Sequence, residues 1–272
     1  MTEKEVQLAV DWAALEGWNP GLNDARLFYG ADRQGFLAGF LDGSPVATVS
    51  AVKYGTNFGF IGFYIVKPDF RGKGFGLRLW QAAMTRLEGC NIGLDGVVAQ
   101  QDNYRKSGFK LAYNNIRYQG QVPETPVGNP NLTNLSDVDF DTLSAYDSAH
   151  FFAPRPGFLG SWIKQQSSLA LGCTSNGRLQ GYGVIRQCVT GCKVGPLFAD
   201  NPDIATQLFA ALANYAKGRT IFLDVPEPNA AAISLAAKNR MLPVFHTARM
   251  YTAEVPSVDL TKIFGVTSFE LG

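Results

Sequence analysis

Hydrophobic and polar positions follow strand and helix periods in a fixed order, and the second half of the chain repeats the order of the first. Leu77, Trp80, Ala83 and Met84 recur at helical spacing, whereas the apolar runs before them are continuous or alternating, as in strands. The first half predicts an N-terminal helix, a hairpin turning at Asp42-Gly43, and then a strand, a helix, a strand, a short helix and a strand over residues 58–66, 77–89, 92–98, 102–107 and 109–118.

The same kinds of element are predicted after residue 135. They are a helix, a hairpin turning at Asn176-Gly177, a strand, an amphipathic helix, a strand, a helix and a last strand, over residues 136–151, 168–189, 192–198, 201–218, 220–225, 229–239 and 242–255. Pro123, Pro126 and Pro130 lie between the halves, a composition typical of a linker. We infer two copies of one α+β unit, residues 1–120 and 136–272, joined by a linker over residues 121–135.

The composition is typical of a soluble globular protein, because 46% of the residues are hydrophobic, 17% are charged and the formal net charge is +1. Such a charge does not steer the protein toward a polyanion, so a nucleic-acid partner is not expected. The N-terminus lacks the basic and apolar regions of a signal peptide. The longest apolar run, residues 58–66, is far shorter than the roughly 20 residues of a membrane span. We expect a cytoplasmic protein without a membrane partner.

The cysteines favour free thiols over a metal site. Cys90, Cys173, Cys188 and Cys192 form no CxxC pair, and the sequence has 2 histidines to complete a site. The spacing of Cys188 and Cys192 would suit half of a zinc site, but it lies across a strand–turn–strand pattern. We expect buried thiols in a reducing compartment and no metal.

A basic, glycine-rich loop separates the strand over residues 58–66 from the helix that follows. Its residues are Arg71, Gly72, Lys73, Gly74, Phe75 and Gly76. The first N–H groups of a helix lack intrahelical partners and lie at the positive end of the macrodipole. Glycines let phosphate oxygens approach the backbone, and Arg71 and Lys73 add positive charge. The loop therefore predicts a pyrophosphate site.

Two common phosphate motifs do not fit this loop. A Walker A loop requires GxxxxGK[ST], which is absent, and the dinucleotide motif GxGxxG would require glycine where Leu77 stands. Asp95 lies about 20 residues further on, as in a dinucleotide-binding fold, but the hairpins upstream favour an antiparallel sheet over repeated βαβ units. A glycine turn with solvated charges is the remaining alternative for the hexapeptide.

The pattern RxxGxG, from Arg71 to Gly76, resembles that of the GNAT superfamily of acetyl-CoA-dependent N-acyltransferases. "YIVKPDFRGKGFGLRLW" is similar to its pyrophosphate-binding strand, loop and helix, and "NYRKSGFK" to its later segment of Asn followed by Tyr-xxx-Gly-Phe. "YDSAHFFAPRPGFLGSWI", "KVGPLFAD" and "LDVPEPN" resemble, more loosely, the C-terminal GNAT-like domain of a two-domain bacterial subgroup. The resemblance implies tandem α/β/α sandwiches, each a mixed, mostly antiparallel sheet flanked by helices.

The resemblance also implies roles by position. Backbone groups of Tyr64, Ile65 and Val66 would pair with the pantetheine arm of acetyl-CoA where two strands splay. N–H groups of the loop from Arg71 to Gly76 would hold the pyrophosphate, and Asn103 would contact the cofactor arm. Tyr104 would protonate the leaving thiolate as general acid; the alternative for Tyr104 is a core tyrosine.

The reaction that the resemblance implies is acetyl transfer to a primary amine by direct attack in a ternary complex. A lysine-like amine with a pKa of about 10.4 is almost entirely protonated at neutral pH, so it must lose a proton before it attacks. Many relatives use a carboxylate on the central strand, and "FGFIGFYIV" has none. Asp95 on the neighbouring strand is the candidate base, directly or through water; it could equally be a structural hydrogen-bonding residue.

The acceptor is not named by the sequence. In this architecture the first helix, the loop after it and the central strand usually frame the acceptor, and the second half could close the pocket. The candidate contacts are Trp18, Asn19, Asp24, Tyr29, Tyr146, Asp147, His150 and Arg155. Each of the first four could instead be a packing or turn residue, and His150 could be a satisfied or an exposed histidine and not a base.

Three functions stay open at this point. The first is an N-acetyltransferase whose first domain is active and whose degenerate second domain shapes the acceptor site. The second is an acetyl-CoA-sensing module without turnover, and the third is a nucleotide-dependent enzyme of another class. Tyr104 and the intact loop favour the first function, and the most plausible partner is a small-molecule amine. The oligomeric state cannot be predicted from these patterns.

Overall fold

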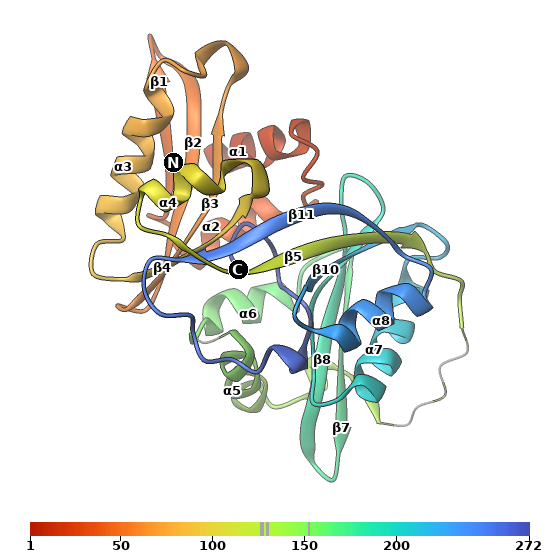
Figure 1. The fold of residues 1–272 in the computed structure, drawn as a ribbon. Helices are drawn as coiled ribbons and strands as arrows, with labels where there is room; N and C mark the ends of the chain where they lie inside the picture. Colours follow the sequence, from red (N-terminus) through yellow and green to blue (C-terminus); the bar gives the residue numbers. More distant parts are fainter. Residues whose placement is uncertain (126–127, 129–130, 152) are drawn as a thin grey trace.

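The computed structural model describes residues 1–125, 128, 131–151 and 153–272 (Figure 1). Pro126 and Pro130 of the expected linker lie outside the described residues. The helices are α1 (Glu3–Leu15), α2 (Asp24–Ala31), α3 (Phe75–Arg86), α4 (Gln101–Lys106), α5 (Phe140–Phe151), α6 (Pro156–Trp162), α7 (Pro202–Tyr215) and α8 (Ala230–Lys238). The strands are β1 (Phe36–Leu41), β2 (Ser44–Tyr54), β3 (Phe58–Val66), β4 (Asn91–Val97), β5 (Lys110–Gln121), β6 (Leu132–Asn134), β7 (Ser168–Ser175), β8 (Arg178–Gln187), β9 (Cys192–Ala199), β10 (Thr220–Pro226), β11 (Leu242–Tyr251) and β12 (Ile263–Gly265).

Local sequence explains where several of these elements begin. Thr2 caps α1 with a reciprocal capping box to Glu5, as the spacing of the two residues suggests. Asn201 accepts hydrogen bonds from the first N–H groups of α7, and Asn229 does the same for α8. Residues 140–151 form the expected helix at the start of the second half. The short helices α2 and α6 were not predicted.

The strands join into a continuous mixed sheet in the order β1-β2-β3-β4-β11-β5-β10-β9-β8-β7-β6, with β12 on β9. The pairs β3–β4 and β9–β10 are parallel, and the other pairs along this path are antiparallel. The predicted α+β class is confirmed. Because βαβ crossovers need a helix, the two parallel pairs are those whose strands are joined through α3 and α7.

The two halves exchange their last strands. β11, from the end of the second half, pairs with β4 of the first half, and β5, from the end of the first half, pairs with β10 of the second half. β5 and β11 pair with each other and run side by side across the middle of the molecule (Figure 1). The division into residues 1–120 and 136–272 stays a prediction, but the sheet crosses that division, so neither half completes its own set of strands.

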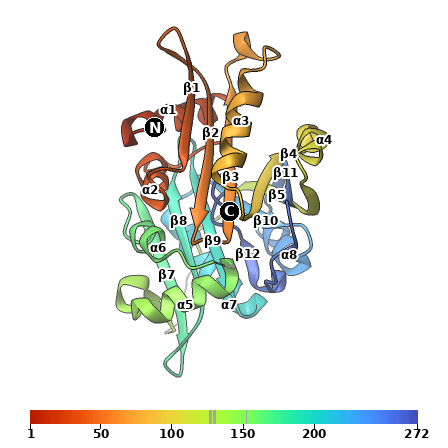
Figure 2. The same cartoon turned by 90° about the vertical axis from the view of Figure 1, so that its left-hand side faces the viewer.

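Helices cover both faces of the sheet. Around β1–β3, α1 and α2 lie on one side and α3 and α4 on the other (Figure 2). The side chains of α1, α2, α5 and α6 share one buried cluster, α3 packs on β2–β4 in a second cluster, and α7 and α8 pack on β9 and β10 in a third. This arrangement is a helix–sheet–helix sandwich that runs through both halves.

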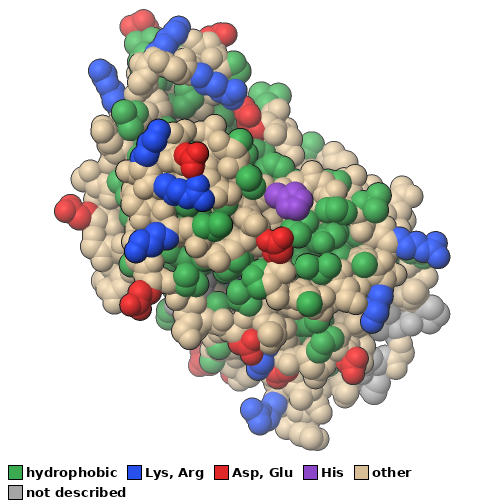
Figure 3. Space-filling view, viewed as in Figure 1, with side chains coloured by type: hydrophobic (Ala, Val, Ile, Leu, Met, Phe, Trp, Pro, Cys, Tyr) green, Lys and Arg blue, Asp and Glu red, His purple; other side chains and the backbone are tan. Residues whose placement is uncertain are grey.

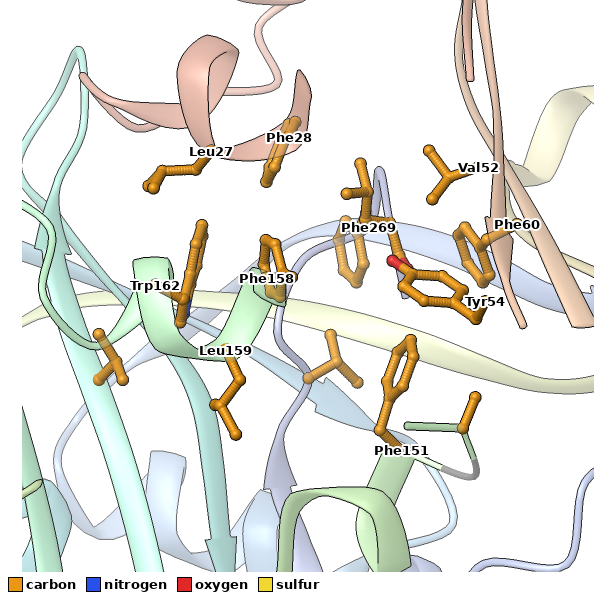
Figure 4. Close-up of a cluster of buried hydrophobic side chains, with 14 of the residues drawn as sticks. Leu27, Phe28, Val52, Tyr54, Phe60, Phe151, Phe158, Leu159, Trp162 and Phe269 are labelled. Atoms are coloured by element: carbon orange, nitrogen blue, oxygen red, sulfur yellow. The ribbon is translucent and has the colours of Figure 1, made fainter. Parts of the chain in front are cut away.

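A shared aromatic core fixes the halves against each other. Phe28 of α2 stacks on Trp162 of α6, with ring centroids 5.9 Å apart and an interplanar angle of 13°. Phe158 and Phe269 lie beside this pair, and Tyr54 of β2 faces Phe151 of α5 (Figure 4). Because these side chains come from both halves and are buried, we expect the two halves to keep a fixed position relative to each other.

The last ten residues thread between the halves. Residues 263–272 are buried, and β12 lies against β9. A Cβ atom on Gly195 would lie 2.6 Å from the carbonyl oxygen of Thr267, and one on Gly62 would lie 2.1 Å from that of Glu270. Glycine at these two positions therefore lets the tail approach β9 and β3. Strand and helix patterns did not predict this segment.

Three further findings bear on the class of protein. Within the described residues, helices are too short or too polar to cross a bilayer. The four cysteines are free; Cys173, Cys188 and Cys192 are buried and Cys90 is half-buried. The same described residues contain no cluster of His, Cys, Asp and Glu that could hold a metal ion.

Candidate active site

The central strands β3 and β4 separate part-way along their length. They pair from Phe58 and Asn91 to Ile61 and Leu94, and beyond this point both strands continue without pairing to each other. β3 is also irregular here: its register with β2 shifts, and Phe63 has a φ of +47°, in the left-handed region. In this gap β4 no longer pairs with the backbone of β3. An extended ligand could therefore pair with β3 as an added strand.

A cavity of about 860 Å³ fills this gap. The first half lines it with residues 62–66 of β3, residues 94–97 of β4 and the loop before α3. The other wall includes β5, β11 and the C-terminal tail, through Arg117, Phe245, Thr247, Phe269 and Glu270. The exchanged strands and the tail thus make the cavity a joint product of both halves.

The glycine-rich loop leads into the N-terminus of α3. Gly72 and Gly74 have φ values of +73° and +82°, which side chains other than glycine rarely adopt. Gly74 is the N-cap of α3, none of the described side chains caps it, and the first turn holds no acidic residue. A Cβ atom on Gly76 would lie 2.7 Å from Tyr64 Oη. The first turn of α3 therefore presents free N–H groups at a positive helix end, which is an anion site.

Basic side chains surround this loop. Arg71 donates to the carbonyl of Val66 at 2.8 Å and forms an ion pair with Glu16 of 2.5 Å, and both side chains of that pair are largely solvated, at 52% and 36% exposed. Lys73 lies over the ring of Phe70, 5.6 Å from its centroid. Lys and Arg side chains gather on the side of the molecule formed by the first half (Figure 3). An exposed ion pair contributes little stability, so Arg71 is free to turn toward a phosphate.

Tyr104 lines the same cavity from α4. Its ring packs on Trp80, with centroids 5.6 Å apart, and over Gly96, where a Cβ atom would lie 2.2 Å from the ring. Burial, with a smaller contribution from Tyr64, raises the pKa of Tyr104 to about 12. The phenol is therefore protonated at neutral pH, as a proton donor must be. Asn103 also lines the cavity, and it donates to Gln100 at 2.7 Å.

Asp95 lines the cavity from β4, but both of its carboxylate oxygens are engaged. Arg249 of β11 donates to them at 2.7 and 2.6 Å, and Asn115 of β5 donates at 2.8 Å. Burial raises the pKa of Asp95, and the contact with Arg249 opposes that rise. These contacts join the exchanged strands to β4, as expected of a structural hydrogen-bonding residue. A role as base stays a prediction.

Comparison with known proteins gives the family. Residues 5–109 match the model of the acetyltransferase (GNAT) family, and residues 143–265 match that of an acetyltransferase (GNAT) domain. The chain is 34% identical, over 99% of its length and 92% of the relative's, to the holothin acyltransferase of Pseudoalteromonas sp. (strain SANK 73390). The chain belongs to the GNAT acetyltransferase family.

Other relatives of this GNAT enzyme agree. It is 30% identical, over 61% of its length and 60% of the relative's, to the uncharacterized N-acetyltransferase YitH of Bacillus subtilis (strain 168). A crystal structure of a protein assigned as an acetyltransferase from Pyrococcus horikoshii matches all of the chain and 94% of its own, with a TM-score of 0.85 at 19% identity. A tandem GNAT protein from the clavulanic acid biosynthesis pathway matches 94% of the chain and 98% of its own, with a TM-score of 0.62 at 12% identity. The expected tandem GNAT fold is confirmed, and proteins of this fold generally use acyl-CoA.

The structure separates the acceptor candidates of the first half. Trp18 lines the cavity of the GNAT enzyme, and its carbonyl accepts a hydrogen bond from Arg117 at 2.7 Å. Asn19 exchanges hydrogen bonds with Thr190, at 2.9 and 2.8 Å. Asp24 and Tyr29 lie on α2 and not in a loop. This helix begins directly after Asn23, and the sequence patterns did not predict it.

Asp24 is a buried structural carboxylate. It pairs with Arg186 of β8 at 3.0 Å and accepts from the backbone of Gly21 at 2.7 Å. Tyr29 is partly buried and packs against the aromatic core. Of the candidates in the first half, the structure thus brings Trp18 to the cavity and places the other three in contacts between the halves or in the core. Their role as acceptor contacts stays a prediction.

The candidates of the second half form a separate buried network. Arg155 pairs with both carboxylate oxygens of Asp147, at 2.8 and 2.7 Å, and Tyr182 also donates to Asp147. The ring of His150 stacks on Tyr146, with centroids 4.3 Å apart, and burial lowers its pKa. These candidates lie away from the cavity wall that the described residues form. Their role as acceptor contacts stays a prediction that the proposal below does not use.

Several wall residues were missed by sequence reasoning. They are Arg117, Phe245, Thr247, Phe269 and Glu270. Arg117 is 3% exposed and pairs with Asp224 at 2.7 Å. Its strand has the same alternation of polar and apolar residues as any other amphipathic strand, so the sequence pattern did not single it out. A charged residue at an inward-facing strand position is the one signal that could have been used.

Proposed function

We propose that this GNAT enzyme transfers an acetyl group from acetyl-CoA to a primary amine of a small molecule, by direct attack in a ternary complex. The observation that carries the proposal is the cavity, which extends from the free helix end of α3 through the gap between β3 and β4 to a wall formed by β5, β11 and the C-terminal tail. Such a cavity can hold an extended donor and a separate acceptor together. Holding two reactants in place is the largest general source of rate, worth up to roughly 7–11 kcal/mol.

The residues of the chain suggest how the acyl donor is held. First-turn N–H groups of α3, with Arg71 and Lys73, suit the pyrophosphate. Residues 62–66 lie where β4 no longer pairs with β3, so backbone groups on that side of β3 suit an amide-bearing arm, because that arm can pair with β3 as a strand would. Asn103 is within the cavity to contact the arm, and Tyr104 stands beside it as the proton donor. Backbone N–H groups of β3 suit the oxyanion that forms at the thioester carbonyl.

The relatives favour a small-molecule acceptor. The enzyme that shares 34% of its residues with this chain over nearly the whole length is named for holothin. The acceptor wall carries the aromatic side chains of Trp18, Phe245 and Phe269, of which Phe269 is buried and the other two are half-buried. A concave wall with several aromatic side chains and a few charged ones suits a compact organic amine.

The test is turnover by the purified chain. Acetyl-CoA, propionyl-CoA, butyryl-CoA and hexanoyl-CoA are each supplied with holothin and with a panel of primary amines, and CoA release and product mass are measured. We expect one amide formed for each CoA released, with acetyl-CoA preferred. Tyr104→Phe should bind acetyl-CoA as the wild type does but lower kcat by about 10²- to 10⁴-fold.

Two results would contradict the proposal. Binding of acetyl-CoA without any amide product would favour a sensing module. A clear preference for a longer acyl chain would keep the acyltransferase activity but remove acetyl-CoA as the donor.

A further inference from the structure

The C-terminal tail places a carboxylate in the wall of the cavity. Glu270 lines the cavity and is 3% exposed. Its Oε2 atom is buried without a hydrogen-bond partner, and its side chain forms neither a hydrogen bond nor an ion pair with any described residue. A buried charged group is ordinarily paired, because desolvation disfavours its ionised form. An unpaired carboxylate beside a reaction cavity therefore needs an explanation.

The fold holds the backbone of Glu270 firmly. The carbonyl of Leu271 accepts a hydrogen bond from Tyr54 Oη at 2.9 Å, and the N–H of Leu271 donates to Ser268 Oγ at 3.1 Å. The backbone of Glu270 lies directly on Gly62, where β3 and β4 begin to separate. The tail thus brings this residue to the point where the donor and the acceptor would meet.

The charged side chains around Glu270 either pair with other residues or form no ion pair with it. The charged groups that face Glu270 are Lys193 of β9, Arg117 of β5, Asp24 of α2 and Arg186 of β8. Arg117 pairs with Asp224, and Arg186 pairs with Asp24. Lys193 Nζ is buried and makes no hydrogen bond with the described residues. Burial raises the pKa of Glu270, and the basic neighbours oppose that rise in part.

We propose that Glu270 is the general base that takes the proton from the amine acceptor. This inference rests on the proposed function. The contrast with Asp95 decides between the two carboxylates, because Asp95 accepts three hydrogen bonds from Arg249 and Asn115, whereas the side chain of Glu270 accepts none from the part of the chain that the structure describes. A carboxylate whose pKa is raised by burial, and whose Oε2 atom accepts no hydrogen bond from the described residues, is the better proton acceptor.

The proposed reaction proceeds through these proton transfers and bond changes. The acceptor ammonium gives one proton to the Glu270 carboxylate, which passes it to solvent. The nitrogen lone pair forms the C–N bond at the thioester carbonyl, and the C–S bond breaks with its electron pair on sulfur. Sulfur takes the proton of Tyr104, the second nitrogen proton leaves through Glu270, and solvent reprotonates Tyr104. The net release is one proton for each amide.

The variant Glu270→Gln tests the assignment, with exposed Glu254→Gln as the matched control. We expect kcat/KM of Glu270→Gln to fall by about 10²- to 10⁴-fold at unchanged acetyl-CoA affinity, and Glu254→Gln to match the wild type. The wild-type plot of kcat/KM against pH should fall on the acid side as Glu270 is protonated, above the usual range for glutamate. Glu270→Gln should lack that fall. Formate should restore part of the rate to Glu270→Ala and none to Glu270→Gln.

The outcomes separate this inference from the proposed function. If Glu270→Gln keeps the wild-type kcat/KM and its acid-side fall, Glu270 is not the base and the proposed function stands. If the wild type binds acetyl-CoA but forms no amide with any amine, both the proposed function and the role of Glu270 are overturned. If Glu270→Gln loses acetyl-CoA affinity as well as rate, the residue supports the cavity wall and the assignment as base fails.

Discussion

Replacing Gly62 with alanine should displace the C-terminal tail from the active site. A Cβ atom at this position would lie 2.1 Å from the carbonyl oxygen of Glu270 and 2.9 Å from its carbonyl carbon and Cα. These are backbone atoms, so they cannot move aside as a flexible side chain would. The tail must move by roughly an ångström to reach ordinary contact, and overpacking of this kind costs about 1–3 kcal/mol.

The same displacement should slow the reaction. A misplacement of about 1 Å in a catalytic group can lower the rate on the order of 100-fold. Gly62→Ala is measured by urea unfolding and by kcat/KM for amide formation, beside Gly30→Ala in α2, where a Cβ atom meets nothing within 4 Å. Gly30→Ala should stabilise the protein by up to about 1 kcal/mol, because alanine favours a helix over glycine, and should leave kcat/KM unchanged. The reasoning is refuted if Gly62→Ala is as stable and as active as the wild type.

Three other perturbations give separate tests. The double variant Arg71→Ala with Lys73→Ala should weaken acetyl-CoA binding by about 10- to 100-fold in calorimetry, because charge-assisted phosphate contacts are lost. The control Lys164→Ala, at an exposed position, should bind as the wild type does. Equal affinities of the double variant and the wild type would show that the loop does not hold the donor. Asp95→Asn should lower the free energy of unfolding by roughly 3 kcal/mol in urea, since it leaves the buried guanidinium of β11 without its counter-charge; an unchanged midpoint would contradict the structural role. Burial lowers the pKa of Lys193, so the stability that this lysine contributes is present above its unfolded value of 10.5 and is lost as the pH falls through the folded pKa. Lys193→Met should therefore raise the free energy of unfolding near neutral pH, and this gain should shrink as the pH rises toward 10.5. A gain that does not change with pH would show that burial does not disfavour the charged form of Lys193.

The segments proposed for the donor side could be picked out from the sequence because their signals are contiguous. The loop from Arg71 to Gly76 and the segment around Tyr104 each carry their residues within one short stretch. Glycine conformation, helix ends and basic charge are local properties, so a sequence pattern can report them. The structure brings both segments to one cavity, and their roles toward the donor stay a prediction.

The acceptor side was not predictable, because its contacts are remote in sequence. Asp95 was a candidate base, but its ion pair with Arg249 joins residues 154 positions apart, and a local pattern cannot show such a partner. The exchange of β5 and β11 is hidden for the same reason, since the two strands have the patterning of any half-buried strand. Glu270 is a lone glutamate in a short apolar segment. Its position became apparent through the burial of the tail.

The most direct test of the account is a crystal structure of the enzyme with CoA and the amide product. The account predicts the pyrophosphate at the N-terminus of α3 and the CoA sulfur within hydrogen-bond reach of Tyr104 Oη. It also predicts the amide nitrogen within hydrogen-bond reach of Glu270, on the wall supplied by the second half. A CoA bound away from the gap between β3 and β4, or an amide nitrogen that faces Asp95 and not Glu270, would contradict it.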